Sequence, residues 1–262
     1  MSDTVLLDVT EGVATVTLNR PEGMNSLTVE AKVALNEAVT AVAGDPRVRA
    51  LVLTGSGRAF CVGQDLREHA ALLDAGDPAP LSTVSEHYNP LVTTLASLPF
   101  PTIAALNGTA AGAGLGLACA LDLRIGAAGS KYTTAFAGIG LTADSGLSWT
   151  LPRLVGAGKA TALLLLAETF TAEQAFEMGL LTMVVPPESV LAVATELAQR
   201  LAAGPTAAYG CIKRSLAFGA DSTLVAALGT EDLEQTRAGN TADHHAAVRS
   251  FLAKQKPVFE GR

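Results

Sequence analysis

Short apolar segments typical of β-strands alternate with helical segments along the first two thirds of the chain, and this alternation restricts the possible folds more than any other feature. The first two apolar segments, VLLDVT and VATVTL, are separated by Glu11-Gly12, which predicts a tight hairpin. A helix is predicted from about 28 to 43, and the buried strand RALVLTG follows it. Strands that alternate with helices in this way favour an α/β domain with a mostly parallel sheet.

The middle of the chain repeats this order. The segment DAGDPAP, residues 74–80, is rich in turn-forming residues and predicts an exposed loop. A helix that ends before Pro99 comes next, followed by the strand PTIAAL. The Gly/Ala-rich segment GTAAGAGLGLACALD then leads from this strand into another helix.

Helical patterns predominate in the last third of the chain. Thr171 and Gln174 form a capping-box pattern, Gly179 predicts the end of that helix, and LTMVV predicts a further strand. Beyond this strand the sequence is helical almost to its end, with a break at Gly204-Pro205. A strand-rich core followed by a helical extension is therefore expected.

The composition excludes several classes of protein. Of the 262 residues, 49% are hydrophobic and 16% are charged, which excludes disorder for the chain as a whole. The 18 basic and 25 acidic residues give a net charge of −7, and no run of Lys or Arg resembles a nucleic-acid-binding arm, so nucleic acid is not an expected partner. The most hydrophobic candidate for a membrane span, 87–121, is interrupted by prolines and glycines, which favours buried core instead.

The opening MSDTVLLDVT lacks the basic start and long apolar region of a signal peptide. The cysteines are odd in number, widely spaced and surrounded by apolar residues, which suits buried thiols in a reducing compartment. They are Cys61, Cys119 and Cys211. A cytoplasmic location is expected. The histidines are interpreted as solvated surface residues that form no metal site, and they are His69, His87, His244 and His245.

The densest local signal is a run of glycines between a strand and a helix, at Gly108, Gly112, Gly114 and Gly116. Small residues let a backbone approach a ligand closely, and the N-terminus of a helix offers unpaired N–H groups. The dinucleotide fingerprint is excluded because it requires glycine where Leu117 stands, and the phosphate-loop Lys-Ser/Thr pair is absent. Close helix packing and an anion-binding turn explain the run equally well.

A second glycine-bearing turn, GRAFCVGQDL, follows the strand RALVLTG in the same manner. Two such turns after two parallel strands can each direct one backbone N–H toward a single oxygen, which would form an oxyanion hole without side chains. Asp65 in this turn is interpreted as a helix N-cap in preference to a chemical role.

Five segments together resemble the enoyl-CoA hydratase/isomerase family, also called the crotonase superfamily. They are NRPEGMNSL, AFCVGQDL, NGTAAGAGLGLACALDLRI, FAGIGLTADSGLSWTLPRLVG and FLAKQKPVFEGR, in the family's order and spacing. The resemblance implies an α/β crotonase (ClpP-like) fold with repeated ββα units that form a stacked sheet core. It also implies a core domain over 1–200, a helical oligomerisation region over 201–262, and a homotrimer or a dimer of trimers.

The resemblance further implies an acyl-CoA thioester as the substrate, with coenzyme A as part of that substrate and no other cofactor. The thioester carbonyl would lie between the backbone N–H groups of Gln64 and Ala113, which would stabilise an enolate. Other positions implied to contact the substrate are Met24, Ala59, Val62, Gly63, Asp65, Leu66, Gly112 and Gly114, with Lys254 at the phosphates.

The catalytic carboxylates depart from the hydratase pattern. The resemblance implies that a hydratase of this family uses two catalytic glutamates, and the two positions fall here on Gly116 and Phe136. Neither residue can transfer a proton, and general acid–base assistance is typically worth about 100- to 10,000-fold for each group. Hydration is therefore disfavoured unless another residue replaces the missing base.

One carboxylate remains near the expected site, at Asp144, in a segment that resembles the isomerases of the 1,2-epoxyphenylacetyl-CoA type. Taken alone, Asp-Ser-Gly is a turn sequence whose aspartate caps the following helix. With the family register, Asp144 is instead interpreted as the base of a double-bond isomerase, in an apolar pocket to which Phe136 and Leu141 contribute. The alternatives are a hydratase with a displaced base and a non-catalytic acyl-CoA-binding protein.

Overall fold

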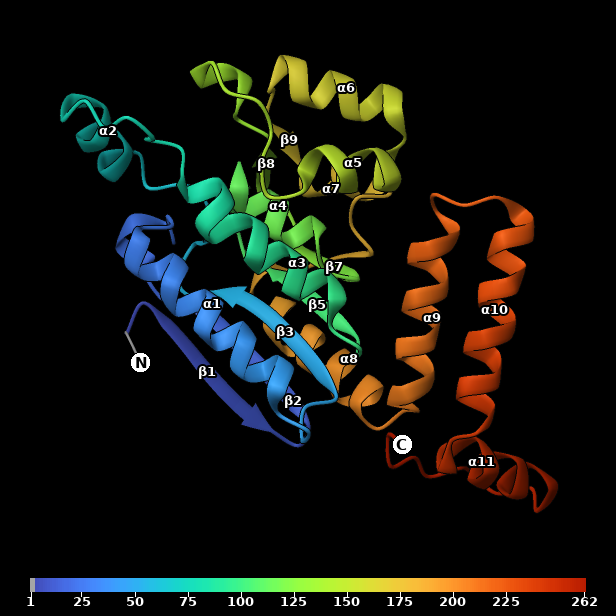
Figure 1. The fold of residues 1–262 in the computed structure, drawn as a ribbon. Helices are drawn as coiled ribbons and strands as arrows, with labels where there is room; N and C mark the ends of the chain where they lie inside the picture. Colours follow the sequence, from blue (N-terminus) through green and yellow to red (C-terminus); the bar gives the residue numbers. More distant parts are fainter. Residues whose placement is uncertain (1–2) are drawn as a thin grey trace.

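The larger of two β-sheets has six strands in the order β1-β2-β3-β5-β7-β10 (Figure 1). The computed structural model describes residues 3–262. The predicted hairpin is confirmed, because β1 and β2 pair antiparallel with Val5 opposite Leu18, and the four further strands run parallel to β2. The strands are β1 (Val5–Thr10), β2 (Val13–Leu18), β3 (Ala50–Gly55), β5 (Thr102–Leu106), β7 (Leu123–Ala127) and β10 (Met183–Val185).

Helices cover both faces of this sheet. In β3, Leu51 and Leu53 pack in one buried cluster with residues of α1 and α3, while Ala50 and Val52 pack in a second cluster with residues of α8. Successive side chains of a strand point to opposite faces, so a continuous apolar run is what a strand covered on both sides requires. The helices are α1 (Val29–Gly44), α3 (Asn89–Ser97) and α8 (Val190–Ala202).

The second sheet has the order β4-β6-β8-β9 and arises from repeated units. In each unit one strand enters the large sheet, the next enters the small sheet, and a helix follows, as in β3, β4, α2 and in β5, β6, α4. This arrangement is the predicted ββα repeat. The elements are β4 (Ala59–Cys61), α2 (Leu66–Asp74), β6 (Thr109–Ala111), α4 (Ala113–Cys119), β8 (Lys131–Thr133) and β9 (Phe170–Thr171).

The expected local signals also hold. The loop over 74–80 is exposed except at its last residue, which is half-buried. The Thr171 and Gln174 capping box is formed at the start of α7, and Gly179 follows the end of that helix with φ +84°. The remaining elements before residue 190 are η1 (Pro21–Gly23), η2 (Val84–Tyr88), η3 (Ala137–Ile139), α5 (Leu147–Val155), α6 (Ala157–Leu166), α7 (Ala172–Glu177) and η4 (Pro187–Ser189).

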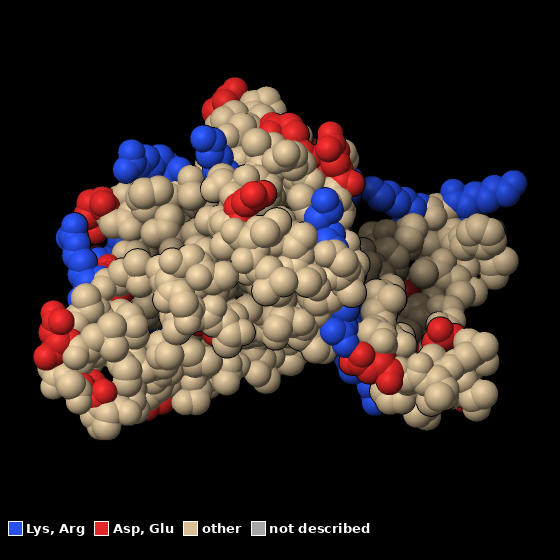
Figure 2. Space-filling model, turned by 90° about the horizontal axis from the view of Figure 1, so that it is seen from above, with Lys and Arg blue, Asp and Glu red and all other residues tan. Residues whose placement is uncertain are grey.

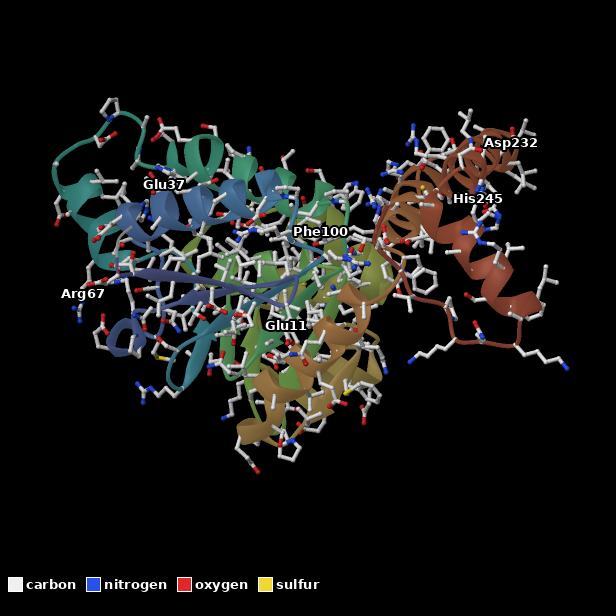
Figure 3. All side chains as sticks on the ribbon, turned by 90° about the horizontal axis from the view of Figure 1, so that it is seen from below. Glu11, Glu37, Arg67, Phe100, Asp232 and His245 are labelled. Carbon is white, nitrogen blue, oxygen red and sulfur yellow. The ribbon has the colours of Figure 1, made fainter. Side chains whose placement is uncertain are left out.

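The C-terminal helices α9 (Thr206–Gly219), α10 (Leu224–Gly239) and α11 (Ala242–Leu252) lie to one side of the sheets. Figure 3 shows Asp232 and His245 on this helical region, set apart from the body that carries Glu37 and Phe100. An ion pair of 2.7 Å between Lys213 on α9 and Asp122 joins the two parts. The role of these helices in oligomerisation stays a prediction.

Within residues 3–262, no helix combines the length and the apolar character that a bilayer crossing requires. The same residues contain no group of three or more His, Cys, Asp or Glu side chains suited to hold a metal ion. On the face seen in Figure 2, Lys and Arg side chains are scattered among acidic and uncharged residues and form no continuous track.

Candidate active site

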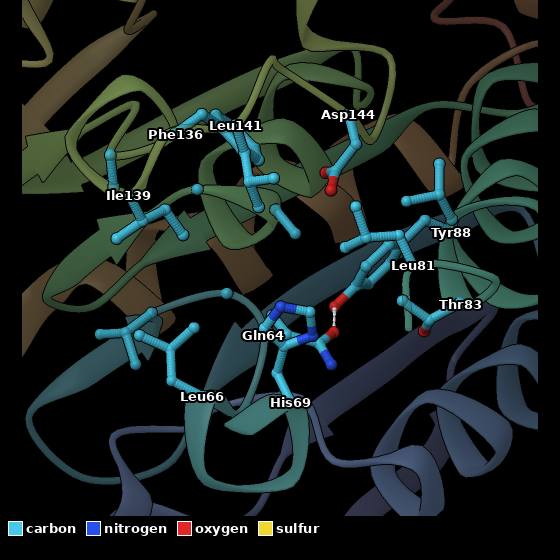
Figure 4. A pocket seen from close by; sticks show the side chains of 16 residues that line it. Gln64, Leu66, His69, Leu81, Thr83, Tyr88, Phe136, Ile139, Leu141 and Asp144 are labelled. Atoms are coloured by element: carbon cyan, nitrogen blue, oxygen red, sulfur yellow. Dashed lines mark hydrogen bonds between the residues drawn. The ribbon is translucent and has the colours of Figure 1, made fainter. Parts of the chain in front are cut away.

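An apolar pocket lies where the two glycine-bearing turns meet, with an empty volume of about 660 Å³ including its open mouth. Its walls come from the turns at 62–64 and 112–113, from α2, and from two segments within 81–88 and 135–144 (Figure 4). The few polar side chains on its walls include Gln64, Tyr88 and Asp144. A mostly apolar cavity with a small number of convergent polar groups is typical of a small-molecule site.

The two turns converge closely because β4 and β6 pair in parallel. A Cβ atom built on Gly63 would lie 3.2 Å from the backbone nitrogen of Ala113 and 2.9 Å from the carbonyl oxygen of Ala111. Gly63 has φ +84° and Gly112 has φ +51°, conformations that side chains rarely adopt. Only glycine therefore allows these two backbone segments to approach each other.

The backbone N–H groups of Gln64 and Ala113 have no hydrogen-bond acceptor within the described part of the chain. Ala113 is the first residue of α4, where helix N–H groups lack an intrahelical partner, and both residues line the pocket. Two backbone donors at one pocket can bind an oxygen that gains negative charge.

The other glycines of the run serve packing. A Cβ atom on Gly114 would overlap the carbonyl group of Cys61, and one on Gly108 would overlap the backbone of Arg58. Close packing thus explains Gly108 and Gly114, whereas Gly112 supplies a turn at the pocket wall. The run therefore combines close packing with a turn that carries a free N–H group.

Asp144 lies on the pocket wall between η3 and α5, and its carboxylate points into the cavity (Figure 4). The Ser145 hydroxyl donates to Asp144 Oδ1 at 2.8 Å. Asp144 does not cap the following helix, because α5 has Gly146 at its N-cap and no side-chain cap. The capping interpretation of Asp144 is therefore wrong.

Burial raises the pKa of Asp144 above the usual 3.8, although the Ser145 hydrogen bond and the charge of Lys32 act in the opposite direction. Phe136 and Leu141 line the same pocket, as expected from the sequence. A carboxylate in such an environment is a stronger base than one in water, which suits proton abstraction.

The pocket wall that Gln64 and Tyr88 form is built around a polar cluster. The Tyr88 hydroxyl donates to Gln64 Oε1, and the Lys32 ammonium donates to the same oxygen at 3.2 Å. Lys32 also donates to Thr83 Oγ1 at 2.6 Å. Three segments of the chain, α1, the turn after β4 and the segment that includes η2, are thus joined behind the pocket.

The structure brings together many of the residues singled out in the sequence. The positions that line the pocket are Val62, Gly63, Gln64, Leu66, Gly112, Ala113, Phe136, Leu141 and Asp144. Five others, including Lys254, do not line it. Ala59 and Gly114 are buried in β4 and α4, and Met24 follows η1. Asp65 is the N-cap of α2, as the residues alone predicted, and accepts hydrogen bonds from Arg67 N and Glu68 N.

Lys254 also lies away from the pocket within this chain. It follows α11, on the helical region that Figure 1 places far from α2 and the pocket. Its side chain is exposed. The expected contact of Lys254 with the phosphates stays a prediction.

Sequence reasoning missed four polar contributors to this site, which are Lys32, His69, Thr83 and Tyr88. His69 was expected on the solvated surface, but it lines the pocket and its Nδ1 atom is buried, so that expectation was wrong. Leu66, His69 and Leu73 recur at helical spacing on α2, which is the signal for one face of that helix, and Leu66 and His69 on this face line the pocket although no residue of α2 is fully buried. Tyr88 and Lys32 were not singled out at all. Lys32 stands three residues before Leu35 and seven before Val39, on the apolar face of α1.

The protein has the crotonase fold. This fold is defined by the two sheets built from ββα units, and the free backbone N–H groups of two turns lie at its apolar pocket. A model of the enoyl-CoA hydratase/isomerase family matches residues 8–262. The chain belongs to the enoyl-CoA hydratase/isomerase family, which acts on acyl-CoA thioesters.

Three similar proteins illustrate the range of this family. The 1,2-epoxyphenylacetyl-CoA isomerase of Escherichia coli K12 is 43% identical over 264 residues and covers 100% of both chains. A Rhodobacter capsulatus protein named as a probable enoyl-CoA hydratase is 42% identical over 260 residues, 99% of this chain and 98% of that one. A crystallised Mycobacterium abscessus protein described as an enoyl-CoA hydratase/isomerase superimposes with a TM-score of 0.96 at 47% identity, covering 98% of this chain and 100% of the other.

Proposed function

We propose that this enzyme shifts a carbon–carbon double bond in an enoyl-CoA thioester, with Asp144 as the single acid/base. The observation that carries the proposal is one carboxylate with a raised pKa on the wall of a pocket to which two free backbone N–H groups belong. The name of the Escherichia coli relative, an acyl-CoA isomerase, supports the same class of reaction.

The first step is proton removal from the carbon next to the thioester. Asp144 takes the proton, and the electron pair of the broken C–H bond moves toward the thioester to give an enolate conjugated with the original double bond. The N–H groups of Gln64 and Ala113 hold the enolate oxygen. One such donor contributes about 3 kcal/mol to lowering the barrier.

The second step returns the proton two carbons farther along the chain. Asp144 delivers the proton to the γ carbon, the thioester carbonyl re-forms, and the double bond now lies between the α and β carbons. The proton that leaves is the proton that returns, so no water and no further group are consumed. The reaction requires no cofactor beyond the coenzyme A that the substrate carries.

Hydration is the less favoured reaction for this pocket. Gly116 and Phe136 occupy the two carboxylate positions of the hydratase pattern, and Phe136 adds an apolar wall where a bound water would need polar partners. A single carboxylate can move one proton between two carbons, whereas addition of water needs assistance to both the water and the carbon.

Parallel assays of β,γ-unsaturated and α,β-unsaturated acyl-CoA thioesters with the same acyl chain test the proposal. We expect isomerisation of the β,γ-unsaturated thioester and little water addition to the other. Asp144→Asn should lower kcat for isomerisation by about 100- to 10,000-fold. Ser148→Ala, at an exposed position of α5, is a matched control that should leave kcat unchanged.

Two results would contradict the proposal, and each favours one alternative. Efficient hydration without isomerisation, unaffected by Asp144→Asn, would indicate a hydratase with a displaced base. Tight acyl-CoA binding with neither isomerisation nor exchange of the α proton in deuterated water would indicate a non-catalytic binding protein.

A further inference from the structure

Lys32 is a lysine with no exposed surface, which is rare for this residue type. Its ammonium group donates to Thr83 Oγ1 at 2.6 Å and to Gln64 Oε1 at 3.2 Å, and lies 5.5 Å from the centre of the Tyr88 ring. An ammonium group removed from water is unfavourable unless such partners replace the water. The partners that surround Lys32 therefore make its burial possible.

Packing alone does not explain a lysine at this position. Leu35 and Val39, on the same face of α1, are fully or almost fully buried. A methionine would fill a similar volume at position 32 without the loss of hydration, and apolar replacements of buried ions are often neutral or stabilising. The charge and the hydrogen bonds of Lys32 are thus the features that need an explanation.

The hydrogen bonds fix the side chain of Gln64. Lys32 can only donate, so the atom of Gln64 that faces it must be the amide oxygen, and the Tyr88 hydroxyl donates to that same oxygen. Two donors on one amide oxygen leave Gln64 a single orientation. Gln64 is also one of the two residues whose backbone N–H is free at the pocket.

The charge of Lys32 acts across the pocket. Figure 4 shows Asp144 on one wall with its carboxylate directed toward the side that carries Gln64 and Tyr88, and Lys32 lies behind that side. The ionisable groups that surround Lys32 are Glu68 on α2, Asp65 at the N-cap of α2, Asp144, and Tyr88 and His87 from η2.

We propose that Lys32 is a positioning residue of this active site, which holds Gln64 in one orientation and places a buried positive charge behind the wall that faces Asp144. The inference rests on the proposed isomerase function. Burial lowers the pKa of Lys32 below the usual 10.5, although the three nearby carboxylates act in the opposite direction and favour its charged form. The charge of Lys32 in turn favours the ionised form of Asp144.

The test is the pH dependence of kcat/KM for Lys32→Met and Lys32→Arg beside the wild type. Loss of the Lys32 charge should move the acidic limb of the kcat/KM profile to higher pH by about 0.5 to 1 unit, because Asp144 then ionises less readily. This shift is smaller than the shift expected for two charges in direct contact. Displacement of Gln64 should lower kcat by up to about 100-fold, with a smaller change in KM because most of the acyl-CoA binds elsewhere. Lys32→Arg should return the limb to the wild-type position.

Lys131→Met is the matched control, because it removes one exposed charge on β8 and should leave the limb in place. A folded Lys32→Met enzyme with a wild-type pH profile would overturn the proposal. If Lys32→Met does not fold, Lys32→Gln replaces it, and failure of both to fold would make Lys32 a structural residue and overturn the proposal.

A wild-type enzyme without isomerase activity would refute the proposed function instead. Carbon NMR can still test the effect of the charge, because it follows the titration of the Asp144 carboxyl group in the wild type and in the Lys32 variants. The Asp144→Asn protein identifies the Asp144 signal, which it lacks. Unchanged titration without Lys32 would overturn the inference separately from the function.

Discussion

Gly116 on α4 lies directly against Ser145, the residue whose hydroxyl donates to Asp144. A Cβ atom on Gly116 would be 2.7 Å from Ser145 Cβ and 3.1 Å from its carbonyl oxygen. Ser145 is buried and has φ +52°, so it has little freedom to move away. Ser145, whose hydroxyl donates to Asp144, thus occupies the space that a side chain at position 116 would need.

Gly116→Ala is therefore expected to destabilise the protein and to impair Asp144. Alanine normally stabilises a helix interior by about 1 kcal/mol relative to glycine. The contact with Ser145 should outweigh this gain, because overpacking a buried site costs about 1–3 kcal/mol. Urea unfolding and kcat should both show the loss.

Gly229→Ala is the matched control for this variant. Gly229 lies within α10, and a Cβ atom built on it meets no atom within 4 Å. It should raise the free energy of unfolding by about 0.5–1 kcal/mol without a change in kcat. A Gly116→Ala protein as stable and as active as wild type would show that Ser145 is free to move.

Ala113→Pro tests the backbone donor on α4. Ala113 is the first residue of the helix, where proline is tolerated because the N–H has no intrahelical partner. The substitution removes the N–H that would hold the enolate oxygen, so kcat should fall by about 100- to 1,000-fold. Ala113→Ser keeps the N–H and should retain most of the activity. A folded Ala113→Pro enzyme with wild-type kcat would refute the role of this donor.

Asp144→Asn should not destabilise the protein at neutral pH, although it should lower kcat by about 100- to 10,000-fold. The pKa of Asp144 is raised in the folded state, so ionisation of this group disfavours folding as the pH rises above the usual 3.8. The variant should thus be as stable as wild type or more stable at pH 7. The difference should shrink below about pH 4, where both states hold the proton. The measurement is the urea midpoint of the variant and of the wild type at pH 7 and at pH 4. A stability difference that favours the wild type more at pH 7 than at pH 4 would contradict the predicted direction.

Many of the strands, turns and helices could be predicted because their signals are local, whereas the repeated ββα arrangement came from the family resemblance. The Glu11-Gly12 turn, the Thr171 capping box and the continuous apolar run of β3 each lie within a few residues. The two glycine-bearing turns could be predicted as a possible oxyanion hole for the same reason, whereas the assignment of the donors to Gln64 and Ala113 came from the family resemblance. The family register then added Asp144, which local sequence alone interpreted as a helix cap.

The polar wall behind the pocket could not be predicted in this way. Lys32 and Gln64 are 32 residues apart, and Lys32 and Thr83 are 51 residues apart. A lysine on a helix is usually solvated. Lys32 is removed from water by the turn that carries Gln64 and by the segment from Thr83 to Tyr88, both distant from it in the sequence. Its place on the face that carries Leu35 was the one indication in the sequence.

Asp65→Ala tests how the cap of α2 supports the pocket. Burial of Asp65 disfavours its charge, but hydrogen bonds from Ser26, Glu68 N, Arg67 N and Arg20 outweigh this effect and hold its pKa below the usual 3.8. The depressed pKa means that Asp65 stabilises the fold above about pH 4 and that this contribution is lost as the pH falls.

Removal of the cap should cost about 1–2 kcal/mol at pH 7, and the difference from wild type should narrow below pH 4. Leu66 and His69 on α2 line the pocket, so KM for acyl-CoA should rise more than kcat falls. Asp65→Asn keeps an acceptor for the helix N–H groups and should recover most of the stability at pH 7. Equal stability of Asp65→Ala and wild type at pH 7 would show that α2 holds its place without this cap, and the pocket wall would then depend on side-chain packing alone.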